Sequence, residues 1–201
     1  MAVGAFRHPM ARCLQADARK LERREWQAWL TEAAKLAVRF DQELWGDDPF
    51  SYNEAASVSL LCAAGSRAGY LCLAEFSTTK KASHNRRKRA AGRSDFWMLG
   101  AAGRSWAFEF KQLTRGSVTV KRLQKKMAEA AKCAACIREN DADVAVAGLI
   151  VPLFYAEPAS LPAAHERLER FALECDAAWR LEGVGGCRQE VYLFFDLVRS
   201  H

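Results

Sequence analysis

Residues 95–112 read DFWMLGAAGRSWAFEFKQ, and this stretch decides the fold. Two short apolar segments flank a glycine-bounded turn, which is the pattern of a β-hairpin. If the bend is centred on Ala102, the antiparallel register places Asp95 opposite Glu109. Strand alternation then separates an apolar core face from a polar face. The core face holds Phe96, Met98, Trp106, Phe108 and Phe110, and the polar face holds Asp95, Glu109 and Lys111.

The polar face of this hairpin contains a predicted electrostatic conflict. Two carboxylates directly opposite each other repel, because cross-strand Cβ atoms are only about 4.5–5.5 Å apart. A divalent cation between Asp95 and Glu109 would resolve the conflict, and carboxylate oxygens suit Mg²⁺ or Mn²⁺. The alternative is a half-exposed strand whose polar residues simply face water.

Helix and strand patterns surround the hairpin on both sides. Hydrophobic spacing predicts helices over 16–44, 51–65, 118–140 and 161–181, and strands over 70–76, 144–154 and 190–198. The basic run 80–93 is predicted to be a loop, and 183–186 a turn. This order predicts an α/β fold with a central mixed β-sheet flanked by helices. We expect a single domain over 1–201, in which 1–48 form a long N-terminal helical extension and 49–201 the core.

Length and composition exclude several classes of protein. A chain of 201 residues, half of them hydrophobic, buries a core without disulfides or structural metals. Its seven cysteines are irregularly spaced, which favours reduced thiols over a disulfide framework, and Cys133-Ala-Ala-Cys136 is expected to pack as thiols. No apolar run reaches the roughly 20 residues of a membrane span, and no secretory signal is recognisable. The expected location is the cytoplasm.

The net charge of +6 is concentrated in two segments. Residues 80–93 and 111–126 together carry thirteen Lys and Arg and no acid, so the rest of the chain has a net charge of −7. Local basic segments on an acidic body are typical of polyanion binders, although a solvated basic loop is the alternative for 80–93. The residues expected to contact phosphates are Lys80, Lys81, Arg86, Arg87, Lys88, Arg89, Arg93, Arg115, Lys121 and Arg122.

Asp95, thirteen intervening residues and then Glu109-Phe110-Lys111, in a hairpin between helices, resembles the PD-(D/E)XK nuclease superfamily. The proline that usually precedes the aspartate is Ser94 here. The resemblance covers roughly 51–154 by element order, and extends to 198 if the last strand joins the sheet. It implies a restriction-endonuclease-like core.

The resemblance also implies roles for individual residues. Asp95, Glu109 and the carbonyl of Phe110 would ligate Mg²⁺ or Mn²⁺, and Lys111 would lie beside the attacking water. Many members add an acid from the helix before the first strand, and Glu54 is the candidate, ahead of Glu43 and Glu75. As the alternative, Ser51 and Glu54 match a capping box, which would make Glu54 only a helix cap. Gln112 is a candidate to hold a phosphate or water.

These observations predict a metal-dependent endonuclease that hydrolyses phosphodiester bonds in DNA through Asp95, Glu109, Lys111 and Glu54. A non-catalytic nucleic-acid-binding or complex-forming module on the same fold is the alternative, and a protein-interaction domain is a third. The expected partner is nucleic acid, DNA in the first instance, with no membrane. The tryptophan-bearing helix over 16–44 fits either the core or an interface in a homodimer or with a partner protein.

Overall fold

The computed structural model describes residues 9–17, 20–43, 48–82, 85–113, 118–154, 158–184 and 189–198, and within them the side chains outside 77–92, 158, 184 and 189. The elements follow the order β1 (Met10–Gln15), α1 (Leu21–Glu43), α2 (Pro49–Tyr52), α3 (Glu54–Arg67), β2 (Leu71–Ala82), β3 (Asn85–Leu99), β4 (Ser105–Gln112), α4 (Val120–Ala134), β5 (Val144–Pro152), the 3-10 helix η1 (Pro158–Ser160), α5 (Leu161–Ala172), β6 (Ala177–Val184) and β7 (Gln189–Val198).

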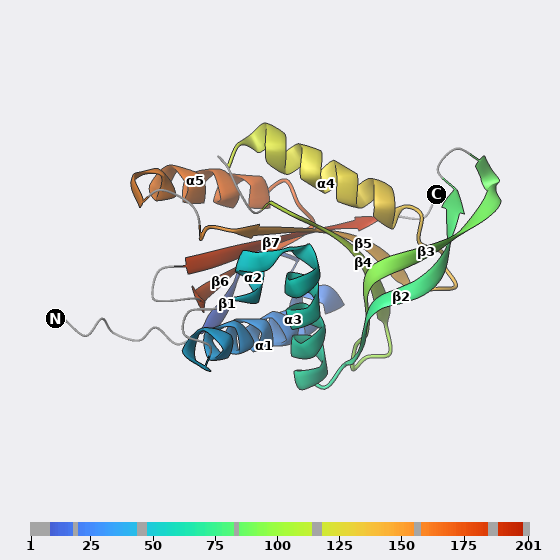
Figure 1. Cartoon of the computed structure of the whole chain (residues 1–201), viewed down its shortest axis with the longest axis horizontal. Coiled ribbons are helices and arrows are strands. Elements are labelled where there is room, and N and C mark those ends of the chain that lie inside the picture. The colour runs from blue at the N-terminus through green and yellow to red at the C-terminus, as the bar shows by residue number, and fades with distance from the viewer. Residues whose placement is uncertain are drawn as a thin grey trace.

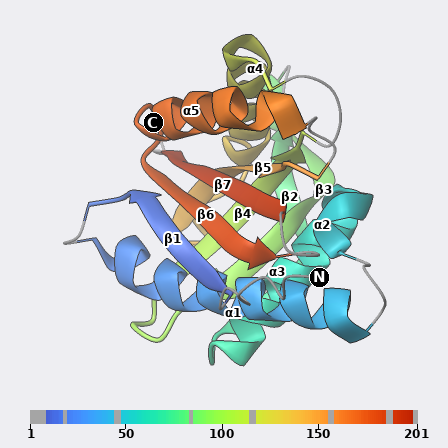
Figure 2. The ribbon, with the colours of Figure 1, turned by 90° about the vertical axis from the view of Figure 1, so that its left-hand side faces the viewer.

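The described strands form one seven-stranded sheet in the order β1-β6-β7-β5-β4-β3-β2. Strands β4 and β5 run parallel, joined through α4, and the other described neighbours run antiparallel. Helices α1 and α3 lie on one face of the sheet, and α4 and α5 lie on the other (Figures 1 and 2). The predicted α/β fold with a central mixed sheet flanked by helices is therefore confirmed.

Helix α1 supplies the centre of one core. The rings of Trp26 and Trp29 are fully buried, and their centroids lie 5.5 and 5.3 Å from that of Phe108. The long N-terminal helix is therefore part of the core packing. The predicted core face of the hairpin is confirmed, because all five of its side chains are fully buried: Phe96, Met98, Trp106, Phe108 and Phe110.

Two buried carboxylates of α1 hold the β3–β4 turn. Glu25 accepts hydrogen bonds from the backbone N–H groups of Ala101 and Ala102, at 3.0 and 3.1 Å. Glu22 accepts from the indole N–H of Trp106 at 3.2 Å. Because buried carboxylates need donors, the turn and α1 satisfy each other. The predicted register is confirmed from Phe96↔Phe108 to Leu99↔Ser105.

Two of the predicted helices are shorter than expected, and each is next in sequence to a strand that the sequence analysis does not predict. The helix predicted over 16–44 begins at Leu21, and residues 10–15 form β1 at the edge of the sheet. The helix predicted over 161–181 ends at Ala172, and β6 follows. In β6, Trp179 and Leu181 alternate into the core, which is the two-residue period of a strand.

The basic run 80–93 was predicted to be a loop, and this prediction is wrong. Strands β2 and β3 continue as an antiparallel hairpin through Lys81↔Arg89, with a register shift before Ala82↔Asn85. Figure 1 shows this hairpin extending beyond the body of the sheet. The helix predicted over 118–140 is α4, which ends at Ala134. Of the turn predicted over 183–186, residues 183 and 184 end β6, and 185–186 lie outside the described residues.

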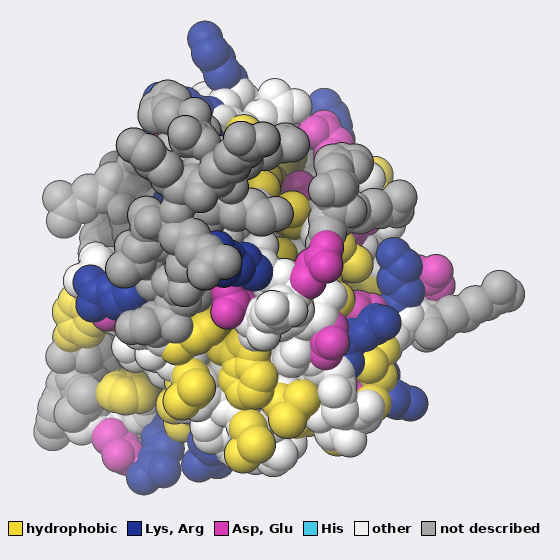
Figure 3. All heavy atoms as spheres, turned by 90° about the vertical axis from the view of Figure 1, so that its right-hand side faces the viewer, with side chains coloured by type: hydrophobic (Ala, Val, Ile, Leu, Met, Phe, Trp, Pro, Cys, Tyr) yellow, Lys and Arg dark blue, Asp and Glu magenta, His cyan; other side chains and the backbone are white. Residues whose placement is uncertain are grey.

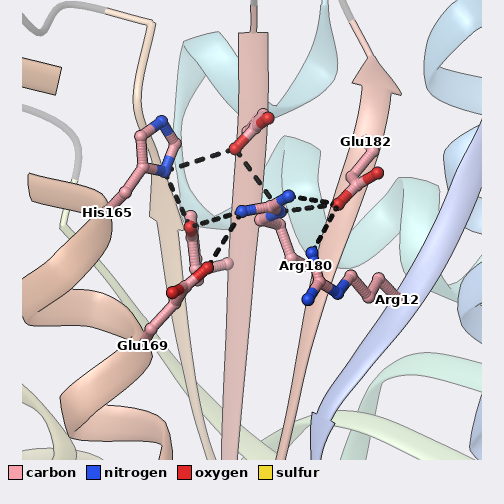
Figure 4. A network of polar contacts seen from close by, with 7 residues as sticks. Arg12, His165, Glu169, Arg180 and Glu182 are labelled. Atoms are coloured by element: carbon pink, nitrogen blue, oxygen red, sulfur yellow. Dashed lines mark hydrogen bonds and ion pairs between the residues drawn. The ribbon is translucent and has the colours of Figure 1, made fainter. Parts of the chain in front are cut away.

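A polar network links α5 to strands β6 and β7 (Figure 4). The guanidinium of Arg180 contacts Glu169 at 3.1 Å and also Glu182, and His165 Nδ1 lies 2.7 Å from the hydroxyl of Tyr192. Burial raises the pKa of Tyr192 to about 12, so the phenol remains protonated at neutral pH. The network belongs to β1, α5, β6 and β7, since Arg12 also reaches Glu182 at 3.8 Å (Figure 4), whereas the site below is built from α3, β2, β3 and β4.

Candidate active site

The site begins where the β3–β4 ladder ends. The last paired residues are Phe96 and Phe108; beyond them, side chains replace the backbone of β3 as partners of β4. Ser94 Oγ donates to the Phe108 carbonyl at 3.2 Å, and Asp95 Oδ2 accepts from the Phe110 N–H at 2.7 Å. Asp95 and Glu109 are therefore not a ladder pair, and the predicted direct opposition of their carboxylates is wrong.

Helix α3 brings a second carboxylate to the same strand. Glu54 Oε2 accepts from the Gln112 N–H at 3.0 Å, and Glu54 Oε1 accepts from Lys111 Nζ at 3.0 Å. The capping-box prediction is wrong, because α2 ends at Tyr52 and Asn53 caps α3 by accepting from Ala56 N–H at 2.9 Å. Glu54 is the first residue of α3, and its carboxylate is directed to β4 rather than to its own helix.

The ammonium of Lys111 lies between two oxygen acceptors. It donates to the Phe110 carbonyl at 2.6 Å and to Glu54, and Asp95 adds negative charge nearby. Partial burial lowers the pKa of Lys111. The hydrogen bond and charge of Glu54, together with the charge of Asp95, raise this pKa by more than burial lowers it, so the pKa of Lys111 is above its ordinary value. In this arrangement Lys111 is a cation and hydrogen-bond donor.

The side chain of Gln112 contacts both α2 and α3, the helix that carries Glu54. Its Nε2 donates to the Phe50 carbonyl of α2 at 2.9 Å, and its Oε1 accepts from Ser57 Oγ of α3 at 2.7 Å. The role predicted for Gln112, holding a phosphate or water, is untested. What the structure shows is a residue that anchors α2 and α3 to β4.

A cavity of about 320 Å³ opens beside these groups. Three acidic residues line it, Glu54 from α3, Glu75 from β2 and Asp95 from β3, together with Ala55, Val58, Ser59 and Ala74. Figure 3 looks onto this end of the molecule, where acidic and basic side chains are interspersed and hydrophobic side chains gather in the lower half. Leu71 and Leu73 of β2 are among the exposed hydrophobic residues, at 66% and 54%.

The structure does not bring all the predicted metal ligands together. Glu109 is 4% exposed, and strand alternation places it, like Lys111, on the opposite face of β4 from Phe108 and Phe110. Among the described residues, it does not line the cavity, and no three His, Cys, Asp or Glu side chains are arranged to hold a metal ion. The carboxylates of Asp95 and Glu54 do meet the same short stretch of β4, at Phe110 N–H and at Lys111 Nζ and Gln112 N–H.

The remaining acidic candidates fall in different places. Glu43 ends α1 and pairs with Arg39 at 2.6 Å, on the surface. Glu75 lines the cavity, pairs with Arg93 at 3.0 Å, and has a φ of 49°, the one positive φ among the described non-glycine residues. A left-handed backbone costs a β-carbon-bearing residue about 1–2 kcal/mol. Glu75 is one of the acids considered in the sequence analysis, but nothing in the neighbouring sequence indicates its left-handed backbone conformation.

Most of the predicted phosphate contacts cannot be placed. The backbones of Lys80, Lys81, Arg86, Arg87, Lys88 and Arg89 lie in the β2–β3 hairpin, but their side chains lie outside the described residues, as does all of Arg115. Arg93, with 71% of its side chain accessible, pairs with Glu75, which lines the cavity. Lys121 and Arg122 lie in the first turn of α4, which Thr119 caps.

No protein-family model, curated protein or solved structure matches the chain. Within the described part of the chain, no helix combines the length and apolar composition that a membrane crossing requires. The six described cysteines form no disulfide with one another.

Proposed function

We propose that this protein is a metal-dependent endonuclease that hydrolyses phosphodiester bonds in DNA. One observation carries the proposal: the carboxylates of Asp95 and Glu54 and the ammonium of Lys111 converge on the backbone of residues 110–112, beside an open cavity. The order α3, β2, β3–β4 hairpin, α4, β5 supports it, because it is the order that the resemblance to the PD-(D/E)XK superfamily implies.

The donors in the site suit a hard divalent cation. Magnesium usually takes one or two protein carboxylates together with waters and substrate phosphate oxygens. Asp95, Glu54 and the Phe110 carbonyl supply oxygen donors of that kind, and two of the three already share a cation, the ammonium of Lys111. When bound, Mg²⁺ or Mn²⁺ polarises the scissile phosphate and lowers the pKa of bound water. Glu109, which is buried, is outside this set.

The residues of the chain have distinct tasks in this proposal. Asp95 and Glu54 are held in place by the N–H groups of Phe110 and Gln112, so each carboxylate is oriented before any ligand arrives. If Glu54 held a metal ion, the ammonium of Lys111 would be free of its ion pair with Glu54, and it would orient the attacking water and stabilise charge on the phosphoryl oxygens. The basic β2–β3 hairpin and the start of α4 bind the DNA backbone without reading sequence.

A second function is favoured by the same contacts. Lys111 neutralises Glu54, and the described residues form no cluster of three metal-binding side chains. Those features suit a non-catalytic nucleic-acid-binding module, in which the site is only an internal ion pair. The two functions differ in what removing the ammonium does to metal binding.

The test combines cleavage with metal binding. Labelled plasmid, linear duplex and single-stranded DNA are incubated with Mg²⁺, Mn²⁺ or EDTA, using wild type, Asp95→Asn, Glu54→Gln and Lys111→Met. Lys35→Ala, which breaks an ion pair with Glu32 on the surface of α1, is the matched control. We expect metal-dependent cleavage that falls by about 10²-fold or more in the three site variants and stays unchanged in the control.

Binding of Mn²⁺, measured by calorimetry, separates the nuclease from the binding module. Lys111→Met removes the competing cation and leaves two carboxylates, so we expect it to bind Mn²⁺ more tightly than wild type while failing to cleave. Salt-sensitive DNA binding that survives all three site substitutions, without cleavage or Mn²⁺ binding, would instead establish the binding module.

A further inference from the structure

Glu75 interrupts the β2–β3 ladder directly opposite Asp95. Cα pairing includes Ala74↔Phe96 and Phe76↔Ser94 but skips the position between them, where Glu75 and Asp95 would meet. At this break Glu75 has a φ of 49°, a conformation that glycine or asparagine adopts more readily than glutamate. The break frees both carboxylates from the regular strand geometry, and both line the cavity.

The stability of the fold does not account for the choice of glutamate at this position. Among the described side chains, the ion-pair partner of Glu75 is Arg93, and the two side chains are 57% and 71% exposed. Exposed ion pairs contribute little to stability, whereas the left-handed backbone reduces it. Strained residues that are retained without a stability benefit cluster at binding and catalytic sites.

Arg93 is well suited to bind a phosphate at the rim of the cavity. A guanidinium has five N–H donors in a planar fork that matches two phosphate oxygens. Its Nη1 donates to Glu75 Oε2 at 3.0 Å, which restrains a long side chain that would otherwise lose conformational freedom on binding. Arg93 lies two residues before Asp95 on the same strand, so a phosphate bound there is adjacent to the acidic cavity.

We propose that Glu75 is a positioning residue for Arg93, and that Arg93 binds a nucleic-acid phosphate next to the one that is cleaved. This inference rests on the proposed function, since it assigns the substrate-binding rim of the same cavity. The role of Glu75 is to fix the guanidinium; the phosphate contact is made by Arg93.

Glu75→Gly gives a direct test, because glycine adopts a φ of 49° without a β-carbon penalty. Its thermal unfolding temperature should equal or exceed that of wild type, while its affinity for a short duplex in EDTA, measured by fluorescence anisotropy, should fall about threefold to tenfold. Arg93→Lys keeps the positive charge but loses the planar guanidinium, and its affinity for the duplex should fall by a similar factor. In Arg93→Ala, the plot of the logarithm of the DNA-binding constant against the logarithm of the salt concentration should also be less steep, by about one unit of slope. Arg170→Lys, in an equally exposed ion pair on α5, is the control and should bind like wild type.

Several results would overturn the inference, and they are distinct from failure of the nuclease proposal. Unchanged DNA affinity in Glu75→Gly, with its unfolding temperature raised, would show that Glu75 is only a strained surface residue. Failure of wild type to bind DNA would also overturn it. If wild type cleaves in a Lys111-dependent way while Glu75→Gly and Arg93→Lys have unchanged KM, the nuclease stands and this inference fails. If Arg93-dependent binding occurs without cleavage, the inference stands and the nuclease fails.

Discussion

Replacing Asp48 with asparagine should stabilise the protein above neutral pH and leave it unchanged in acid. Asp48 is the N-cap of α2, is 1% exposed, and accepts from the Phe50 N–H through Oδ1 at 2.8 Å. Among the described residues, its Oδ2 has no hydrogen-bond partner. Burial raises the pKa of Asp48 to about 7, opposed by the Phe50 N–H and assisted by the charge of Asp41.

The sign and size follow from proton linkage. The folded state keeps the Asp48 proton up to about pH 7, whereas the unfolded chain releases it near the ordinary value of 3.8. The unfolded state therefore binds fewer protons between these values, and stability falls as pH rises from about 4 to about 7. The gap between the two pKa values corresponds to roughly 4 kcal/mol, fully expressed above the folded pKa.

Asparagine keeps the cap and removes the titration. Its side-chain oxygen still accepts from the Phe50 N–H, and asparagine caps helices as well as aspartate does. The free energy of unfolding of Asp48→Asn should match wild type near pH 4 and exceed it by a few kcal/mol at pH 8, by urea titration followed through tryptophan fluorescence. Asp41→Asn should also raise the free energy of unfolding at pH 8, by a smaller amount, because the charge of Asp41 contributes to the raised pKa of Asp48. A difference between Asp48→Asn and wild type that does not change between pH 4 and 8, or one that falls with pH, would refute this reasoning.

Two glycines give further tests of the packing that holds the site. Gly100→Ala would place a Cβ 1.8 Å from Glu25 Oε2, breaking the carboxylate clamp on the β3–β4 turn; we expect a loss of more than about 2 kcal/mol by urea unfolding. Gly103→Ala, at a φ of 79° but with no atom within 4 Å of the new Cβ, should lose only about 1 kcal/mol. Gly148→Ala would bring a Cβ to 2.4 Å from the Phe110 ring, and should reduce both the unfolding free energy by about 1–3 kcal/mol and any cleavage activity, since Phe110 adjoins Lys111.

The sequence predicted the hairpin well because its determinants are local. A short turn sets the register, and two-residue alternation sorts the side chains, so the core face could be read from 95–112 alone. The end of the ladder is not local. It depends on Ser94 and Asp95 meeting the backbone of Phe108 and Phe110 across the hairpin, and on Glu54 arriving from another helix. For that reason the predicted opposition of Asp95 and Glu109 failed.

Strands β1 and β6 were missed for a related reason. Met10 pairs with Glu182 at the far end of the chain, so nothing near residue 10 indicates a strand partner. Strand β6 begins with two alanines, which suit a helix as well as a strand, and the alternation of Trp179 and Leu181 is the one local signal that distinguishes them. The basic hairpin was assigned as a loop because strand alternation is hidden when charged residues occupy both faces.

The residue types of the candidate site answer two demands at once. Where β3 turns away from β4, the N–H groups of Phe110 and Gln112 lose backbone partners, and buried donors must be satisfied. Carboxylates meet that demand, but so would amides, which also accept hydrogen bonds. If the acids were present only to satisfy these donors, Asp95→Asn and Glu54→Gln would leave metal binding and cleavage unchanged. Loss of metal binding or cleavage with folding intact in those variants would show that the negative charge, and not the hydrogen bond, is what the site requires.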